Sequence, residues 1–83
     1  MSNKYILESL ASDLKRVALG KHRGSDSMAN RFLEEALKRR NEVEMNSLKP
    51  YLKKILGKLN ENIDADEALM YGTLIQNYTQ YSK

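Results

Sequence analysis

The chain has 83 residues, of which 41% are hydrophobic and 30% are charged, and its formal net charge is +3. This length and composition are typical of one ordered globular domain, residues 1–83, and the absence of cysteine excludes disulfides, thiolate nucleophiles and cysteine-based zinc sites. No stretch reaches the roughly 20 apolar residues of a membrane span, and the first residues lack the apolar core of a signal peptide, so we expect a cytoplasmic protein.

The first predicted helix covers residues 4–19. Gly20 follows it, at the position where a left-handed residue commonly ends a helix. The apolar side chains of this helix share one arc of about 140°. They are Ile6, Leu7, Leu10, Ala11, Leu14, Val17 and Ala18. The connection that follows, residues 20–27, combines glycines, basic-type residues and helix-capping residues, including the only histidine, His22.

The second predicted helix runs from about Met28 to Met45. Its outer face offers two acid-first pairs at a spacing of four, Glu34 with Lys38 and Glu35 with Arg39, which is typical of a solvated surface. Arg40 projects instead to the middle of the apolar arc. In one interpretation the aliphatic part of the Arg40 side chain lies on the core, while its guanidinium reaches water or pairs with Glu44. In the other, Arg40 belongs to a site that faces a partner or ligand.

A third, short helix is predicted after Asn46 and Ser47, with Pro50 in its first turn, where the missing N–H is tolerated. One arc is apolar, and it comprises Leu48, Tyr51, Leu52, Ile55, Leu56 and Leu59. The other arc carries only lysines among its charged residues: Lys49, Lys53, Lys54 and Lys58. The alternative is that the second helix continues through a kink at Pro50.

The last predicted helix extends from Asp64 to Tyr81. Asp64 as N-cap and Glu67 form a capping box, Ile63 with Ala68 forms a hydrophobic staple, and Gly72 in the interior indicates a close helix crossing. Its apolar arc spans about 200°, twice the usual stripe, and comprises Ala68, Met70, Tyr71, Gly72, Leu74, Ile75, Tyr78 and Tyr81. One neighbouring helix cannot cover this arc, so we expect the chain to be organised around this helix.

These elements predict an all-α protein, a small antiparallel up-and-down bundle of four helices, with the third helix short or continuous with the second.

The sequence gives little support for an enzymatic function. His22 has no cysteine partner, no helical metal motif is present, and the glycines of residues 20–25 have the wrong spacing for a phosphate loop. We therefore expect a non-enzymatic protein without a cofactor or a metal.

Protein association is the favoured function, because the last helix has more apolar surface than one neighbour covers. The predicted interface is Tyr71, Leu74, Tyr78 and Tyr81, since tyrosine brings large contact area and keeps a hydroxyl for water or a partner. The expected partner is a second copy, as a homodimer, or another protein. Alternatively, the first three helices cover the whole arc within a monomer.

Nucleic-acid binding is the alternative function. From Lys15 to Lys58 the chain carries 12 Lys and Arg against 5 acids, so the positive charge is concentrated in its middle. The candidate phosphate contacts are Lys21, Arg23, Arg40, Lys49, Lys53, Lys54 and Lys58. The third helix also resembles an interfacial membrane helix, but the bundle core needs the same apolar face, so a membrane role is not favoured.

Overall fold

The computed structural model describes residues 3–81, and the side chains of residues 3–80. Within this range the chain is helical and contains no strand, which confirms the all-α prediction. The elements in chain order are α1 (Asn3–His22), α2 (Asp26–Glu42), the short 3-10 helix η1 (Met45–Ser47), α3 (Pro50–Gly57) and α4 (Ala65–Tyr81).

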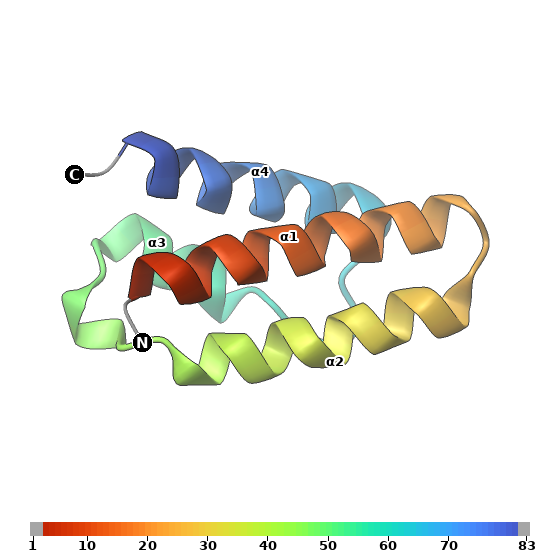
Figure 1. The fold of residues 1–83 in the computed structure, drawn as a ribbon, viewed down its shortest axis with the longest axis horizontal. Helices are drawn as coiled ribbons and strands as arrows, with labels where there is room; N and C mark the ends of the chain where they lie inside the picture. The colour runs from red at the N-terminus through yellow and green to blue at the C-terminus, as the bar shows by residue number, and fades with distance from the viewer. Residues whose placement is uncertain (1–2, 82–83) are drawn as a thin grey trace.

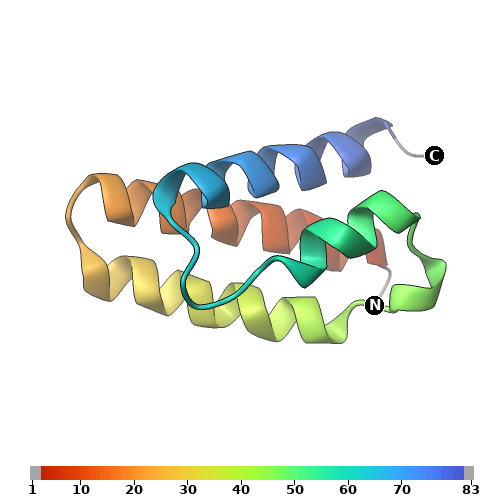
Figure 2. The ribbon, with the colours of Figure 1, turned by 180° about the vertical axis from the view of Figure 1, so that it is seen from behind.

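Helix α1 lies at the centre of the arrangement. It packs against α2 on one side and α4 on the other, and both neighbours run antiparallel to it (Figure 1). Seen from behind, α3 lies between α2 and α4 and covers the remaining side (Figure 2). The four α-helices therefore alternate in direction, but the organising helix is α1 and not the last helix, so that expectation was wrong.

Two glycines explain why α1 takes this place. A Cβ on Gly20 of α1 would lie 2.9 Å from the backbone nitrogen of Ala29 in α2. A Cβ on Gly72 of α4 would lie 3.1 Å from the carbonyl oxygen of Ala11 in α1. Each missing side chain lets one long helix approach α1 closely. The close crossing predicted at Gly72 is confirmed, and Gly20 adds a second crossing.

The core is built from the apolar arcs of all four helices. Helix α1 contributes the most buried apolar residues, and α3 with the segment that follows it contributes more than α2 or α4. The largest fully buried side chains are Leu7, Leu10, Leu14, Val17, Leu52, Leu56, Leu59, Ile63 and Ile75. The short α3 is thus an integral part of the bundle, because Leu52, Ile55 and Leu56 of its apolar face are buried within the chain.

The end of α1 differs from the prediction. The helix continues through Gly20 to His22, and the left-handed residue is Gly24, with φ of 72°. The N–H of Ser25 donates to the Gly20 carbonyl at 2.8 Å, and the N–H of Gly24 donates to the Lys21 carbonyl at 3.2 Å. This pair of hydrogen bonds is a Schellman motif, so the later of the two glycines ends the helix.

The connection between α2 and α3 confirms two separate helices, and the alternative of one kinked helix is wrong. Helix α2 ends at Glu42, Val43 is extended, and Pro50 occupies the first turn of α3. Asn3 holds this turn to the start of α1, because its side chain accepts from the N–H of Glu44 at 2.9 Å and donates to the carbonyl of Glu44 at 3.0 Å.

The start of α4 has the predicted capping box. The N–H of Glu67 donates to Oδ1 of Asp64 at 2.7 Å, and the N–H of Asp64 donates to Oε1 of Glu67 at 3.2 Å. Ile63 and Ala68, the predicted staple, are both buried. The beginning of α4, and hence the direction of its faces, is therefore set by local sequence.

Candidate functional site

The inner half of the wide apolar arc on α4 is covered by the chain itself. Ala68 and Ile75 are fully buried, Gly72 lies at the crossing with α1, and Tyr71 is only 6% exposed. Tyr71 was predicted as an interface residue, but in this fold it belongs to the hydrophobic core. Packing against α1 accounts for much of this coverage.

The outer half of the arc remains open. Met70 is 49% exposed and Leu74 is 40% exposed, and Tyr78 is half-buried one turn further along. These three residues follow one another at a spacing of four, so they form a single stripe along α4. The side chain of Tyr81, the last predicted interface residue, lies outside the part of the structure that is described.

Tyr51 of α3 extends this stripe onto a second helix. Its ring packs edge-on against the ring of Tyr78, with centroids 6.0 Å apart and an interplanar angle of 70°, and the residue is 49% exposed. The sequence placed Tyr51 on the core arc of its helix, so it was missed as a surface residue. We call Tyr51, Met70, Leu74 and Tyr78 the α3–α4 apolar surface.

The charged residues that border this surface differ in sign between its two helices: lysines on α3 and an aspartate on α4. Lys58 and Lys54 lie about 20° and 60° from Tyr51 around the α3 axis, so they share its edge, whereas Lys53 lies on the opposite edge. On α4, Asp66 precedes Met70 by one turn and lies about 40° from it. Lys54, Lys58 and Asp66 are all exposed.

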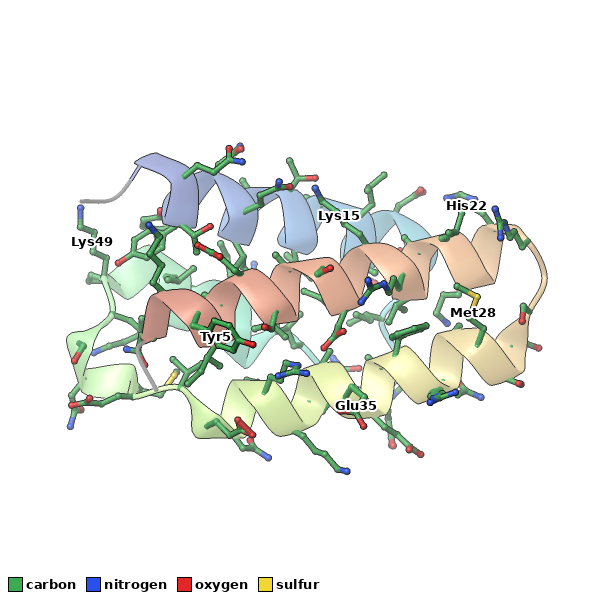
Figure 3. The ribbon with its side chains drawn as sticks, viewed as in Figure 1. Tyr5, Lys15, His22, Met28, Glu35 and Lys49 are labelled. Atoms are coloured by element: carbon green, nitrogen blue, oxygen red, sulfur yellow. The ribbon has the colours of Figure 1, made fainter. Side chains whose placement is uncertain are left out.

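The predicted nucleic-acid contacts are not brought together. Lys21 and Arg23 lie at the turn between α1 and α2, next to the labelled His22, while the labelled Lys49 lies at the other end of the molecule (Figure 3). The molecule is 36 Å long in this direction. The basic residues therefore form two separate groups and not one continuous surface.

Arg40 has a structural partner, and it is not Glu44. Its Nη1 donates to the carbonyl of Leu59, beyond the end of α3, and the residue is half-buried. The guanidinium therefore joins α2 to the segment between α3 and α4. This contact supports the structural alternative for Arg40, and it removes the residue from the exposed basic groups.

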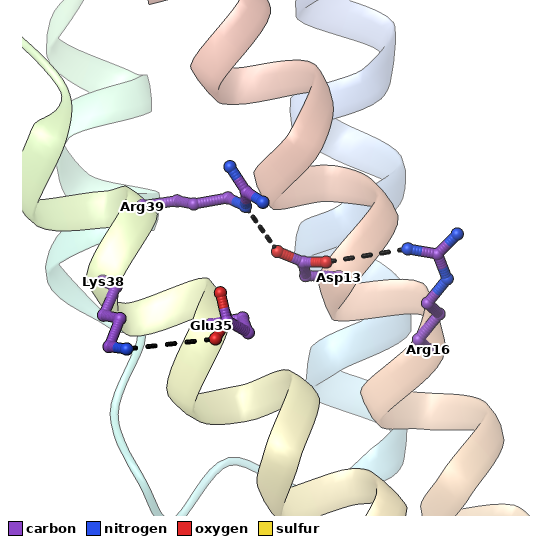
Figure 4. A network of polar contacts seen from close by, with 5 residues as sticks. All are labelled: Asp13, Arg16, Glu35, Lys38 and Arg39. Atoms are coloured by element: carbon purple, nitrogen blue, oxygen red, sulfur yellow. Dashed lines mark hydrogen bonds and ion pairs between the residues drawn. The ribbon is translucent and has the colours of Figure 1, made fainter.

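A polar network between α1 and α2 was not predicted (Figure 4). Asp13 of α1 is 5% exposed, and its carboxylate accepts from Nε of Arg39 at 2.8 Å and lies 3.8 Å from Nη1 of Arg16. Because Arg39 reaches across to Asp13, the predicted pair with Glu35 is wrong. Lys38 pairs with Glu35 at 3.9 Å, and not with the predicted Glu34.

We expect the Asp13 to Arg39 contact to stabilise the α1–α2 pair. Asp13→Ala should lower the free energy of unfolding by about 1 to 2 kcal/mol, less than for a fully buried ion pair, because the Arg39 side chain is 34% exposed. A double-mutant cycle with Arg39→Ala in urea should give a coupling near 1 kcal/mol. Additive single effects would show that the contact contributes nothing.

The side chains that line the groove between α1 and α4 do not form a recognisable catalytic or metal-binding arrangement. The groove is lined mainly by polar side chains, and one of them, Lys15, donates to the side-chain oxygen of Gln76. Among residues 3–81, no group of three or more His, Cys, Asp or Glu side chains is placed to hold a metal ion. No helix in the same range combines the length and hydropathy needed to cross a membrane.

Comparisons of the chain with models of known protein families, with curated proteins and with solved structures find no significant match.

Proposed function

We propose that this protein acts by self-association through the α3–α4 apolar surface. The observation that carries the proposal is the exposure of three large apolar side chains, Tyr51, Met70 and Leu74, on two adjacent helices. Tyr78 joins them, because its ring contacts Tyr51. A contiguous apolar patch of this kind, bordered by charged residues, is typical of a protein interaction site.

The residue types also fit an interface. Tyrosine and methionine are enriched at protein interfaces, and a tyrosine ring brings large area with few rotatable bonds. The edge-on contact between Tyr51 and Tyr78 holds both rings in place before any partner binds, which lowers the entropy lost on association. Self-association through one self-complementary patch is the commonest form of soluble oligomer.

The sharpest test compares two leucines of the same helix. Leu74 is 40% exposed within the α3–α4 apolar surface, and Leu69 is 46% exposed about 140° away around α4. Leu74→Glu should weaken the dimer at least about tenfold, because each interface would then desolvate two carboxylates. Leu69→Glu, the matched control, should leave the dimerisation constant unchanged.

Sedimentation equilibrium of the two variants beside the unmodified chain measures this difference directly. Circular dichroism should show the same helix content in all three, since both leucines are exposed. Equal dimerisation constants for Leu74→Glu and the unmodified chain would refute the proposed surface. Loss of the dimer in Leu69→Glu alone would place the interface on the other side of α4.

A further inference from the structure

We infer that Met70 is an oxidation site that governs the proposed self-association. A peroxide that converts the Met70 thioether to a sulfoxide would prevent two copies from pairing through the α3–α4 apolar surface. The inference rests on the proposed self-association and adds its regulation. It is carried by the position of Met70 within that surface and by its exposure on the single chain.

Methionine is the only sulfur-containing residue type in the chain, which has four methionines and no cysteine. Because no thiol competes for a peroxide, the methionine thioethers are the oxidisable sulfur groups of this protein. The structure describes the side chains of Met28, Met45 and Met70. Met70 is the most exposed of the three at 49%, Met45 is 39% exposed and Met28 is half-buried.

These three methionines lie on different parts of the molecule. Met70 belongs to the α3–α4 apolar surface, one turn before Leu74 on the same stripe of α4. Met45 lines a groove between α2 and α3, on the other side of α3 from α4 (Figure 2). Met28 lies near the start of α2, beside the turn that follows α1 (Figure 3). Pairing through the α3–α4 apolar surface would therefore cover Met70 and leave the other two as they are.

The reaction adds one oxygen atom to the side chain. The Met70 sulfur attacks hydrogen peroxide, the O–O bond breaks, an S–O bond forms, and the second oxygen leaves as water. The sulfur loses two electrons and the peroxide gains them. The product is a polar sulfoxide. Methionine sulfoxide reductases reverse the change with a dithiol, which becomes a disulfide while the oxygen leaves as water.

The sulfoxide opposes pairing because its oxygen would lose water without a replacement donor from its own stripe. Leu74, one turn after Met70, has no polar side-chain atom, and the ionised carboxylate of Asp66, one turn before it, only accepts hydrogen bonds. Burying an acceptor without a partner costs free energy, and a two-fold pair contains the group twice. Oxidation of Met70 should therefore weaken the dimer at least about tenfold.

Two leucine variants test the site. Leucine has a volume similar to that of methionine and no sulfur, so Met70→Leu and its matched control Met45→Leu should each dimerise within about threefold of the unmodified chain. After treatment with hydrogen peroxide, the unmodified chain and Met45→Leu should lose the dimer, whereas Met70→Leu should keep it. Sedimentation equilibrium measures the constants, peptide mass spectrometry measures oxidation at each methionine, and circular dichroism checks the helix content. Reductases with dithiothreitol should restore the dimer of the oxidised unmodified chain.

The rate of oxidation gives a second, independent measurement. Because pairing covers Met70, only the free chain should react there. The rate at Met70 should therefore fall as the chain concentration rises, roughly tenfold once about nine-tenths of the chains are paired. Met45 in the same sample is the internal control, and its rate should not change with concentration.

Two failures are distinguishable. An unmodified chain that keeps its dimerisation constant when Met70 is fully oxidised would overturn the oxidation site and leave self-association standing. Loss of the dimer in peroxide-treated Met70→Leu, with unchanged helix content, would do the same. An unmodified chain that stays monomeric at all concentrations would refute the self-association itself, and its regulation through Met70 with it.

Discussion

Leu14→Ala is expected to lower the free energy of unfolding by about 3 kcal/mol, within the range measured for fully buried leucines in other proteins. Leu14 is completely buried in α1 and lies against the position of Gly72 in α4. Alanine would leave a cavity at the crossing of two helices, where neither backbone can move inward freely. A domain of this size has a total stability on the order of 4 to 12 kcal/mol, so the loss would be a large fraction.

Leu19→Ala provides the matched control for this prediction. Leu19 lies on the same helix but is 42% exposed, so its truncation should cost less than about 1 kcal/mol. Urea unfolding followed by circular dichroism measures both values on a common scale. Equal destabilisation by the two variants would contradict the central position of α1, and so would a negligible effect of Leu14→Ala.

Gly20→Ala is expected to destabilise the protein by about 1 to 2 kcal/mol, although alanine is the better helix former. The new Cβ would lie 2.9 Å from the backbone nitrogen and 3.1 Å from the Cα of Ala29. Both atoms belong to the first part of α2, which cannot yield as a flexible side chain could. The separation of α1 and α2 would have to increase, and the packing along both helices would suffer.

Gly57→Ala is the control with the opposite expected sign. A Cβ at Gly57, the last residue of α3, meets no atom within 4 Å. The substitution should therefore stabilise the protein by up to about 1 kcal/mol through helix propensity alone. Thermal or urea unfolding of both variants measures the signs. Stabilisation by Gly20→Ala would show that the α1–α2 crossing is not tight.

Local signals in the sequence were sufficient for the fold class and for most helix boundaries. Asp64 and Glu67 specify the start of α4 through neighbouring backbone groups, and Pro50 specifies the start of α3 through its missing N–H. Such signals act within a few residues, so they can be interpreted without knowledge of the tertiary arrangement. Gly20 and Gly24 are both glycines near the end of α1, and the sequence does not show which of them takes the left-handed conformation. The structure gives that role to Gly24 and places Gly20 against Ala29.

The α3–α4 apolar surface was only partly predictable from the sequence, because it too depends on how the helices pack together. Periodicity placed Tyr71, Leu74 and Tyr78 on one apolar arc of α4, but it could not show which side of the arc α1 would cover. The fold buries Tyr71 and leaves Leu74 open. Tyr51 was assigned to the core because its arc is apolar, and its exposure became evident only from the position of α3 beside α4.

Asp13 shows that ion pairs between different helices are also difficult to predict from the sequence. A single acid at the edge of an apolar arc gives no periodic signal, and its partner Arg39 is 26 residues away in the sequence. The acid-first spacing of Glu35 and Arg39 instead favoured a local pair. The longer contact is formed because α2 packs against α1 with Arg39 facing the buried carboxylate of Asp13. Ion pairs between residues of different helices can therefore be predicted only when the packing of those helices is known.

The measurement that tests self-association most directly is the molar mass of the unmodified chain by light scattering, over a concentration series at low and high salt. The absorbance ratio should be recorded to exclude co-purified nucleic acid. We predict a mass that rises to twice the 9.6 kDa of the chain and persists at high salt, because the contact is mainly apolar. A mass of 9.6 kDa at every concentration would contradict self-association through the α3–α4 apolar surface.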